Sequence, residues 1–456
     1  MKFVDRIEET KRLRSLLAQK DGAFACLYGR RRIGKSRLLR EVIAGRKDAI
    51  LHIADRSDAV LQRARLAQDI GKLIPGFGSV TYPDWGTLFD RWLKDAPKDS
   101  LFILDEFPYL VERSPELPSI LQRIFEDITP TGIKCIICGS SQRMMQGLVL
   151  DEREPLYGRA AEIMNLRPIG FDWMKTVFPA LSPRGRLEHY AVWGGVPRYW
   201  ELSEHENSLW HTVRQHVFSP LGLLRNEPAH LLLDDLKDSV QASSILSIIG
   251  MGTSRMSEIA SRLQVPTTAL GGPLKRLTDL GLVYKEIPFG CDAKSNKRSL
   301  YRIADPFLDF WYRFVLPNYS DESYLEDPDD LADFKKSFSI HLGHVWEKLV
   351  QDILPLRKIT GISKRLRKPA RWWGNGSNGK PMELDIVAET VDSKTLLVGE
   401  AKLSLSVREA EHAMSELKVK ASLLPFAAEY DKVVCQLFVA DNPPGAALGL
   451  DWAEGN

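Results

Sequence analysis

The sequence contains no apolar run long enough to cross a membrane, and its first residues lack the apolar core of a signal peptide. We therefore expect a cytoplasmic protein with no membrane partner. Cysteine is scarce, and the five that occur are an odd number, which fits reduced thiols in that compartment. Cys135 and Cys138 have the spacing of a metal-binding pair. No second pair follows, so a buried strand is the favoured interpretation.

Neither sign of charge is in large excess, because the formal net charge is only +2. A net charge this small favours neither nucleic acid nor any other class of partner. The local distribution of charge along the chain is more informative. A hydrophobic content of 44% and a charged content of 27% are typical of a globular protein. A chain of 456 residues is too long for one core, and its length predicts roughly three domains.

A phosphate-binding motif, Gly29-x-x-x-x-Gly34-Lys35-Ser36, lies between an apolar strand pattern and a helical pattern. The two glycines let backbone N–H groups converge on an anion, and the following helix directs its positive end at the phosphates. Lys35 would reach the β- and γ-phosphates, and Ser36 would offer a hydroxyl to Mg²⁺. We predict an ATP site that involves the whole loop, whose other members are Arg30, Arg31, Arg32, Ile33 and Arg37.

Acidic and hydroxyl side chains follow later strand patterns. Residues 101–104 are apolar and end in Asp105 and Glu106, which predicts a magnesium ligand and a residue that orients or deprotonates the attacking water. Ser140 follows the strand expected at 133–138 and is either a contact to the γ-phosphate or water, or a helix cap. Arg159 is either a further γ-phosphate contact or an ordinary surface arginine.

The alternation of apolar and helical patterns up to residue 170 predicts an α/β fold with a doubly wound parallel sheet. Strands are expected at 24–28, 49–53, 101–106 and 133–138, and helices at 36–42, 58–74 and 84–95. Ligands of such sheets bind at the carboxyl ends of the strands, where the motifs above fall.

A helical pattern over 186–202 is broken by Gly194-Gly195-Val196-Pro197. With this break the chain resembles an ATPase of the STAND branch of the AAA+-related P-loop proteins, close to the archaeal-type ATPase family. The resemblance implies that a Gly-x-Pro on a helical lid contacts the nucleotide, and Gly195 and Pro197 fit that motif. It also supports the roles given to Lys35, Asp105 and Ser140.

Residues 243–305 have the order of a winged helix-turn-helix domain, with three helical patterns followed by strands at 283–288 and 299–303. Two interpretations stay open, DNA binding and packing against other parts of the protein. A positive face favours the first and would be formed by Lys275, Arg276, Lys285, Lys294, Lys297 and Arg298. Gly271-Gly272-Pro273 counts against a base-reading helix. The acidic segment 321–333 is expected to be a solvated linker.

The last part combines a helix at 338–353 containing Glu347, a strand at 383–387 containing Asp385, and a strand at 396–402 with Glu400-x-Lys402. A helix at 407–424 and a strand at 433–440 follow. This pattern resembles the PD-(D/E)xK, or restriction-endonuclease-like, fold. The resemblance implies that Asp385 and Glu400 hold Mg²⁺ or Mn²⁺, that Glu347 completes the shell, and that Lys402 activates water.

A basic segment at 357–373 with adjoining tryptophans would suit a phosphodiester backbone, although a solvated loop is the alternative. The predicted domains are residues 1–170 (P-loop ATPase), 171–240 (helical lid), 241–318 (winged helix) and 319–456 (nuclease-like). Two functions follow. One is an ATPase that controls a metal-dependent nuclease acting on DNA. The other is an ATP-dependent switch whose non-cleaving nuclease fold binds DNA or protein. A homo-oligomer or a partner protein is left open.

Overall fold

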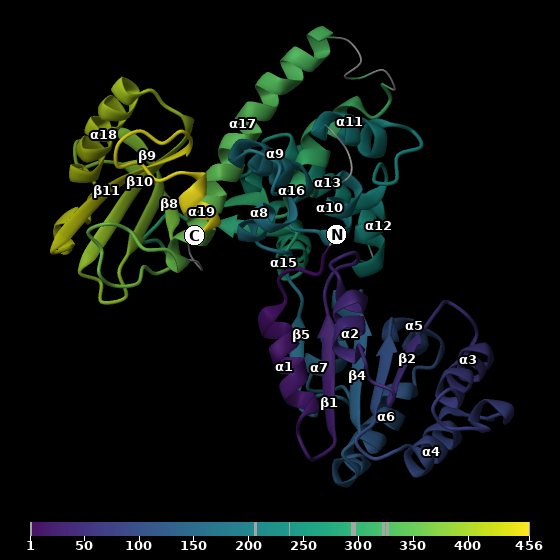
Figure 1. Cartoon of the computed structure of the whole chain (residues 1–456). Helices are drawn as coiled ribbons and strands as arrows, with labels where there is room; N and C mark the ends of the chain where they lie inside the picture. The colour runs from purple at the N-terminus through teal and green to yellow at the C-terminus, as the bar shows by residue number, and fades with distance from the viewer. Residues whose placement is uncertain are drawn as a thin grey trace.

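The computed structural model describes residues 2–204, 208–236, 238–292, 298–321, 324 and 328–455. Its N-terminal part is a five-stranded parallel sheet with the order β2-β3-β4-β1-β5 (Figure 1). The strands are β1 (Ala23–Tyr28), β2 (Ala49–Ile53), β3 (Leu101–Asp105), β4 (Lys134–Gly139) and β5 (Glu162–Asn165). The expected parallel sheet is confirmed, and the four predicted strands lie within a few residues of their expected positions, whereas β5 was not predicted.

Helices cover both faces of this sheet because alternate strand residues point to opposite sides. One core joins the sheet to α1 (Ile7–Leu17) and α2 (Lys35–Ile43). The other joins it to α3 (Ala59–Gly71), α4 (Trp85–Asp95), α5 (Phe107–Arg113), α6 (Leu117–Asp127) and α7 (Gln142–Leu150). Cys135 and Cys138 of β4 are buried in different cores, so the strand interpretation of these cysteines is correct.

A group of short helices follows the sheet. They are α8 (Met174–Val177), α9 (Pro183–Trp193), α10 (Pro197–Ser203), α11 (Leu209–Val213) and α12 (Glu227–Asp235). The predicted break falls between α9 and α10, where Gly194 has a φ of +56°, a left-handed value that suits glycine. We call these helices the lid.

Three helices and a hairpin come next: α13 (Ser239–Gly250), α14 (Met256–Arg262), α15 (Gly271–Asp279), β6 (Val283–Glu286) and β7 (Leu300–Ile303). The hairpin is antiparallel, as expected. Gly271, Gly272 and Pro273 form the first turn of α15. Backbone N–H groups of a first turn have no intrahelical acceptor, so a proline there costs the helix no hydrogen bond. Two of the expected basic residues, Lys294 and Lys297, lie outside the described residues.

The long helix α17 (Pro328–Ile353) follows α16 (Pro306–Phe310) and corrects one expectation. Residues 328–333 are its first turns rather than part of a solvated linker. The aromatic rings of Phe334 and Phe338 stack on one another and pack against Phe310 and Trp210. This packing anchors the N-terminal half of the helix in the protein, which the acidic composition of the segment does not indicate.

The C-terminal sheet has the order β11-β10-β9-β8. Strands β8 (Ala370–Asn375), β9 (Pro381–Glu389) and β10 (Thr395–Ser404) run antiparallel, and α18 (Val407–Ser422) leads to β11 (Lys432–Asp441), which is parallel to β10. The short α19 (Leu450–Glu454) ends the described chain. One hydrophobic core joins the lid, α13 to α17 and one face of this sheet, with α17 lying between them (Figure 1).

The basic segment 357–373 is only partly a loop, which corrects a second expectation. Residues 370–373 belong to β8, and Trp372 is buried in the core under α18. Arg371 donates to Glu286 of β6 at 3.2 Å and pairs with Glu383. This end of the segment therefore packs against the hairpin, whereas Lys364, Arg365 and Lys368 are exposed.

Candidate functional site

The phosphate-binding loop connects β1 to α2 and has the backbone that its glycines predict. Gly29 and Gly34 have φ values of +154° and +96°, and a Cβ on Gly29 would lie 2.7 Å from the carbonyl oxygen of Leu166. Gly34 is the N-cap of α2, so the free N–H groups of that helix face the loop. A phosphate placed there would meet several backbone donors at once.

Lys35 is buried, and three oxygens of the loop region hold its ammonium group. Its Nζ donates to the carbonyl oxygens of Gly29 at 2.8 Å and Arg30 at 3.1 Å, and to Ser140 Oγ at 3.0 Å. Ser140 in turn donates to Glu106 through its hydroxyl at 2.7 Å and its backbone N–H at 3.2 Å. The structure thus brings the predicted Lys35, Glu106 and Ser140 into one hydrogen-bonded group.

The predicted magnesium ligands also meet. Ser36 Oγ donates to Asp105 Oδ2 at 2.6 Å, and Asp105 is only 1% exposed at the end of β3. A hydroxyl and a carboxylate are the hard oxygen ligands that Mg²⁺ takes beside a nucleotide phosphate. These two residues therefore fit the ion in chemistry and in position.

A cavity of about 520 Å³ opens beside this group, between the loop and the lid. Nine of the predicted residues line it: Arg31, Arg32, Gly34, Lys35, Ser36, Arg37, Glu106, Ser140 and Pro197. The sequence prediction missed five others, which are Arg40, Tyr109, Arg198, Glu201 and Asp234. Arg198 directly follows Pro197, so its place in the lid motif is the signal by which it could have been found.

Besides Arg159, five predicted residues of the nucleotide site do not line the cavity, namely Gly29, Arg30, Ile33, Asp105 and Gly195, and the last of these and Ile33 have clear structural roles. Ile33 is fully buried in the core that contains α1 and α2, and Gly195 packs against the backbone of Ile169. A Cβ on Gly195 would be 2.0 Å from the carbonyl oxygen of Ile169, whose N–H donates to the Gly195 carbonyl at 2.8 Å. Gly195 therefore fixes the lid to the chain that leaves β5, and Pro197 is the member of the motif that reaches Gly34.

Arg159 is placed elsewhere. Its guanidinium donates to Glu126 at 2.9 Å and to the carbonyl oxygen of Tyr157 at 3.2 Å, and it does not line the cavity. The structure does not bring it to the phosphate loop, in accordance with the surface interpretation.

The arginines of the loop bind acidic residues of the lid and beyond. Arg32 pairs with Glu227 at 2.9 Å, Arg31 with Asp234 at 3.4 Å and Arg37 with Glu201 at 3.1 Å. Arg30 is buried and pairs with Asp305, which caps α16 by accepting from the N–H of Leu308 at 2.9 Å. Every pair joins the loop region to a helix further along the chain. A shift of the loop would therefore break or move ion pairs with the lid and with α16.

A second cluster lies where β9 and β10 meet α17. Asp385 Oδ2 accepts from the N–H of Ala401 at 3.0 Å, and Lys402 Nζ donates to Glu400 Oε1 at 2.9 Å. Burial and the nearby charges of Glu347 and Glu400 raise the pKa of Asp385 to about 6. Burial also opposes ionisation of Glu347, but the hydrogen bond and charge of His344 lower the pKa of that carboxyl below its usual value.

The structure thus brings Glu347, Asp385, Glu400 and Lys402 into one neighbourhood. In the part of the chain that the structure describes, however, no three acidic, histidine or cysteine side chains are grouped closely enough to hold a metal ion. Glu400 is instead held by Lys402 and, at 3.4 Å, by Lys420. The carboxylate oxygens fit a divalent cation in their chemistry, and the repulsion that raises the Asp385 pKa is what such a cation would relieve.

Comparison with known proteins gives two family matches. Residues 3–199 match a family of ATPase domains that occurs predominantly in Archaea, and residues 311–413 match archaeal and bacterial proteins of unknown function. An uncharacterized protein of Methanocaldococcus jannaschii is 30% identical over 425 residues, which cover 92% of each chain.

Among solved structures, the Walker-type ATPase of Pyrococcus abyssi is similar with a TM-score of 0.53 and 20% identity, over 68% of this chain and 96% of that one. A STAND protein of Pyrococcus horikoshii with a tetratricopeptide repeat sensor has a TM-score of 0.33 and 18% identity, over 78% of this chain and 50% of its own. The first of these likenesses supports the fold. None of the helices in the described ranges is long and apolar enough to cross a membrane.

Proposed function

The chain belongs to the family of ATPases found predominantly in Archaea, and we propose that ATP bound at the phosphate loop controls a nuclease site in the C-terminal domain. The observation that carries the first half is the hydrogen-bonded group of Lys35, Ser140 and Glu106 beside the Ser36–Asp105 pair. The observation that carries the second half is the neighbourhood of Asp385, Glu400 and Lys402.

At the nucleotide site, each side chain has a separate task. Lys35 exchanges its loop oxygens for the β- and γ-phosphates, because phosphate oxygens are stronger acceptors than carbonyls. Ser36 and Asp105 would hold Mg²⁺, which would neutralise charge on the phosphates. Glu106, freed from Ser140, orients the attacking water. Arg198 of the lid, which lines the same cavity, takes the γ-phosphate role that the sequence gave to Arg159.

In this proposal the loop arginines transmit a conformational change from the nucleotide site to the rest of the protein. Their partners Glu227, Asp234, Glu201 and Asp305 lie on or next to α12, α10 and α16. Since α16 shares a core with α17, a change at the loop reaches the helix that carries Glu347. Communication of this kind needs a bistable element, and the lid, which borders the nucleotide cavity and shares a core with α17, is our candidate for it.

The C-terminal domain supports a nuclease assignment by its strand order as well as by its acids. The helix, the strands β9 and β10, the crossover helix and the last strand follow one another in the order that the nuclease resemblance implies, and β8, which was not predicted, joins the sheet beside β9. Asp385 and Glu400 would hold Mg²⁺, which supplies electrostatic stabilisation at the scissile phosphate. Lys402 positions water, and the exposed Lys364, Arg365 and Lys368 contact the backbone of DNA.

Residues 241–318 serve in this proposal as a winged helix that packs on its neighbours rather than as a reader of base sequence. Phe289 donates its N–H to the carbonyl of Arg371 at 2.8 Å, and Arg371 also bonds to Glu286 of β6. Lys275 of α15 pairs with Asp279 at 2.6 Å. These contacts favour a relay between the lid and the C-terminal sheet.

The experiment is a nuclease assay on plasmid, linear and single-stranded DNA and on RNA, with Mg²⁺ or Mn²⁺ and with or without ATP. Asp385→Ala should abolish cleavage, and Lys35→Ala should remove its dependence on ATP. Lys35→Ala should also weaken ATP binding roughly tenfold or more, since a hydrogen bond to a charged group contributes about 1.5–3 kcal/mol. Arg159→Ala is the matched control and should behave like the unaltered protein.

A second candidate is a switch whose C-terminal domain binds without cutting. The observation that favours it is the neutralisation of Glu400 by Lys402 and Lys420, which leaves no preformed group of three metal ligands in the described residues. Failure to cleave any substrate with either metal, in protein that still binds ATP, would establish this second candidate and end the first.

A further inference from the structure

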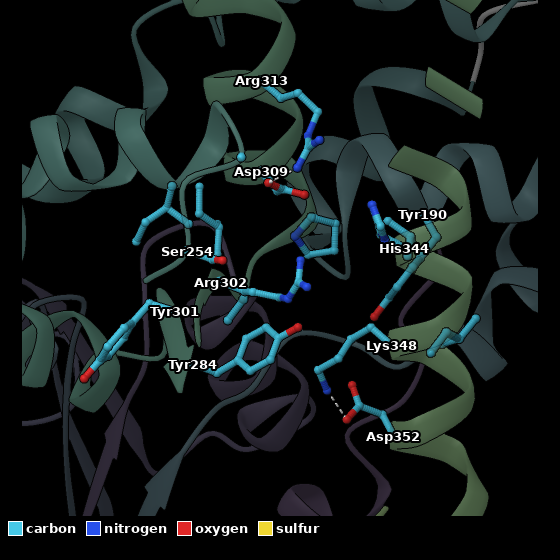
Figure 2. Close-up of a pocket in the computed structure, with 17 residues that line it drawn as sticks. Tyr190, Ser254, Tyr284, Tyr301, Arg302, Asp309, Arg313, His344, Lys348 and Asp352 are labelled. Carbon is cyan, nitrogen blue, oxygen red and sulfur yellow. Dashed lines mark hydrogen bonds and ion pairs between the residues drawn. The ribbon is translucent and has the colours of Figure 1, made fainter. Parts of the chain in front are cut away.

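A second cavity, whose lining shares no residue with the cavity at the phosphate loop, has a volume of about 130 Å³ (Figure 2). Its walls come from five places: Tyr190 of α9, the α13 region, the β6–β7 hairpin, the α16 region with Asp309 and Arg313, and α17. A molecule bound there would touch the lid, the hairpin and the helix that carries Glu347. Its size suits a small metabolite and not a dinucleotide.

Hydrogen-bond donors converge on this cavity. Figure 2 shows the guanidinium of Arg302 and the hydroxyl of Tyr284 directed toward its middle, with the ammonium of Lys348 nearby, where it pairs with Asp352. Within the described residues, neither the Tyr190 nor the Tyr284 hydroxyl has a hydrogen-bond partner. Burial raises the pKa of both tyrosines, so both hydroxyls keep their protons and can donate.

The cations of the cavity are only partly satisfied by its acids. Arg302 donates to Glu286 at 2.8 Å, and Lys348 pairs with Asp352. Arg313 is 3.6 Å from Asp309, too far for a good hydrogen bond, and its buried Nε has no partner among the described atoms. Asp309 is engaged instead by His341 at 3.2 Å. A buried donor without an acceptor is unfavourable, and an acceptor on a bound anion would relieve this.

We propose that this cavity binds a small phosphorylated molecule with an apolar or aromatic body. A phosphate offers three terminal oxygens, which suits convergent donors from Arg302, Lys348 and the two tyrosines better than the two oxygens of a carboxylate. The remaining walls are apolar and include Ile249, Ile303, Val345 and Leu349. They would receive the rest of the molecule, as in most small-ligand sites.

The ligand would act as an effector, a role that rests on the function proposed above. It would connect Arg302 of the hairpin to Lys348 of α17, and Lys348 is adjacent to Glu347. His344, which also lines the cavity, lies 3.8 Å from the Glu347 carboxylate. Occupancy of the cavity would thus set the position of the helix residue that faces Asp385.

The test is calorimetric titration of the full chain with phenyl phosphate, in the presence of saturating Mg²⁺ and ADP so that the phosphate loop is filled. We expect one site per chain. Tyr284→Phe and Lys348→Ala should each weaken binding roughly tenfold, as the loss of a hydrogen bond to a charged group implies. Tyr301→Phe is the matched control, because its hydroxyl points away from the cavity centre (Figure 2). Phenol and inorganic phosphate should each bind more weakly than phenyl phosphate.

Absence of saturable binding up to about 10 mM, or equal affinity in Tyr284→Phe, Lys348→Ala and the unaltered protein, would overturn the proposal. The nuclease assay repeated with phenyl phosphate tests the effector role separately. Binding without any effect on cleavage or ATP turnover would leave the site standing and remove the effector role. Binding in a protein that never cleaves would refute the nuclease alone.

Discussion

Replacement of Asp385 by asparagine tests the C-terminal site through stability as well as activity. Asp385 is buried between two other acids, and its Oδ2 accepts from the N–H of Ala401 at 3.0 Å. Asparagine has the same shape, and its carbonyl oxygen can keep that hydrogen bond. The change therefore removes the charge and little else. We expect Asp385→Asn to stabilise the metal-free protein while it abolishes cleavage.

The magnitude follows from the pKa of Asp385, which is raised from the ordinary 3.8 to about 6. Because the folded pKa is the higher one, the folded protein binds more protons than the unfolded chain between these values. Its stability therefore falls as pH rises through that window. At about 1.36 kcal/mol per pH unit, ionisation of Asp385 costs up to about 3 kcal/mol above pH 7. Asparagine avoids this cost.

The assay is thermal or denaturant unfolding of both proteins in EDTA at several pH values from 4 to 8. The advantage of Asp385→Asn should be near zero at pH 4 and reach about 1–3 kcal/mol above pH 7. Adding Mg²⁺ or Mn²⁺ should raise the melting temperature of the unaltered protein by binding the folded state, and should leave the variant unchanged.

Two results would contradict this reasoning. An advantage that is the same at pH 4 and pH 8 would mean that the charge of Asp385 is not the cause. A variant that is less stable than the unaltered protein at pH 8 would mean that Lys402 and Lys420 already neutralise the negative charge of the cluster. Ionised Asp385 would then cost no folding free energy, and a bound metal ion would have no repulsion to relieve.

The remaining predictions concern two contacts, the ion pair that Arg30 of the phosphate loop makes with Asp305 and the packing of Gly195 of the lid against Ile169. Arg30→Met should destabilise the protein by about 3–5 kcal/mol, because it leaves Asp305 buried without its cation, and Arg30→Met/Asp305→Asn should recover part of the loss. Equal unfolding midpoints for the single and double variants would refute this. Gly195→Ala should lower the melting temperature and expose the lid to proteolysis, since its Cβ would meet Ile169, at a cost of about 1–3 kcal/mol. Gly147→Ala is its control, because Gly147 lies within α7 with open space around it, and we expect a gain of about 0.5–1 kcal/mol.

The local elements of this protein are readable from its sequence because short-range rules define them. Buried parallel strands appear as apolar runs, and β1, β3 and β4 are found within one or two residues of the predicted spans. The helix break at Gly194 and the start of α2 at the phosphate loop follow from glycine and proline in the same way. Residues 328–333 were predicted wrongly because an acidic composition does not reveal the aromatic packing that makes them helical.

The sequence by itself determined which residues are candidates for the chemistry, namely the loop around Lys35, the acids at the end of β3 and the acid–x–lysine strand. Each of these depends on neighbours a few positions away. The tertiary structure decided what those residues contact. Arg30 and Asp305 are 275 positions apart, and no local pattern links them. The same holds for the placement of Arg198 instead of Arg159 and for the convergence of Tyr190, Arg302 and Lys348. Such contacts depend on how separate helices and sheets pack, because a side chain's partners are set by the burial of many distant apolar residues together.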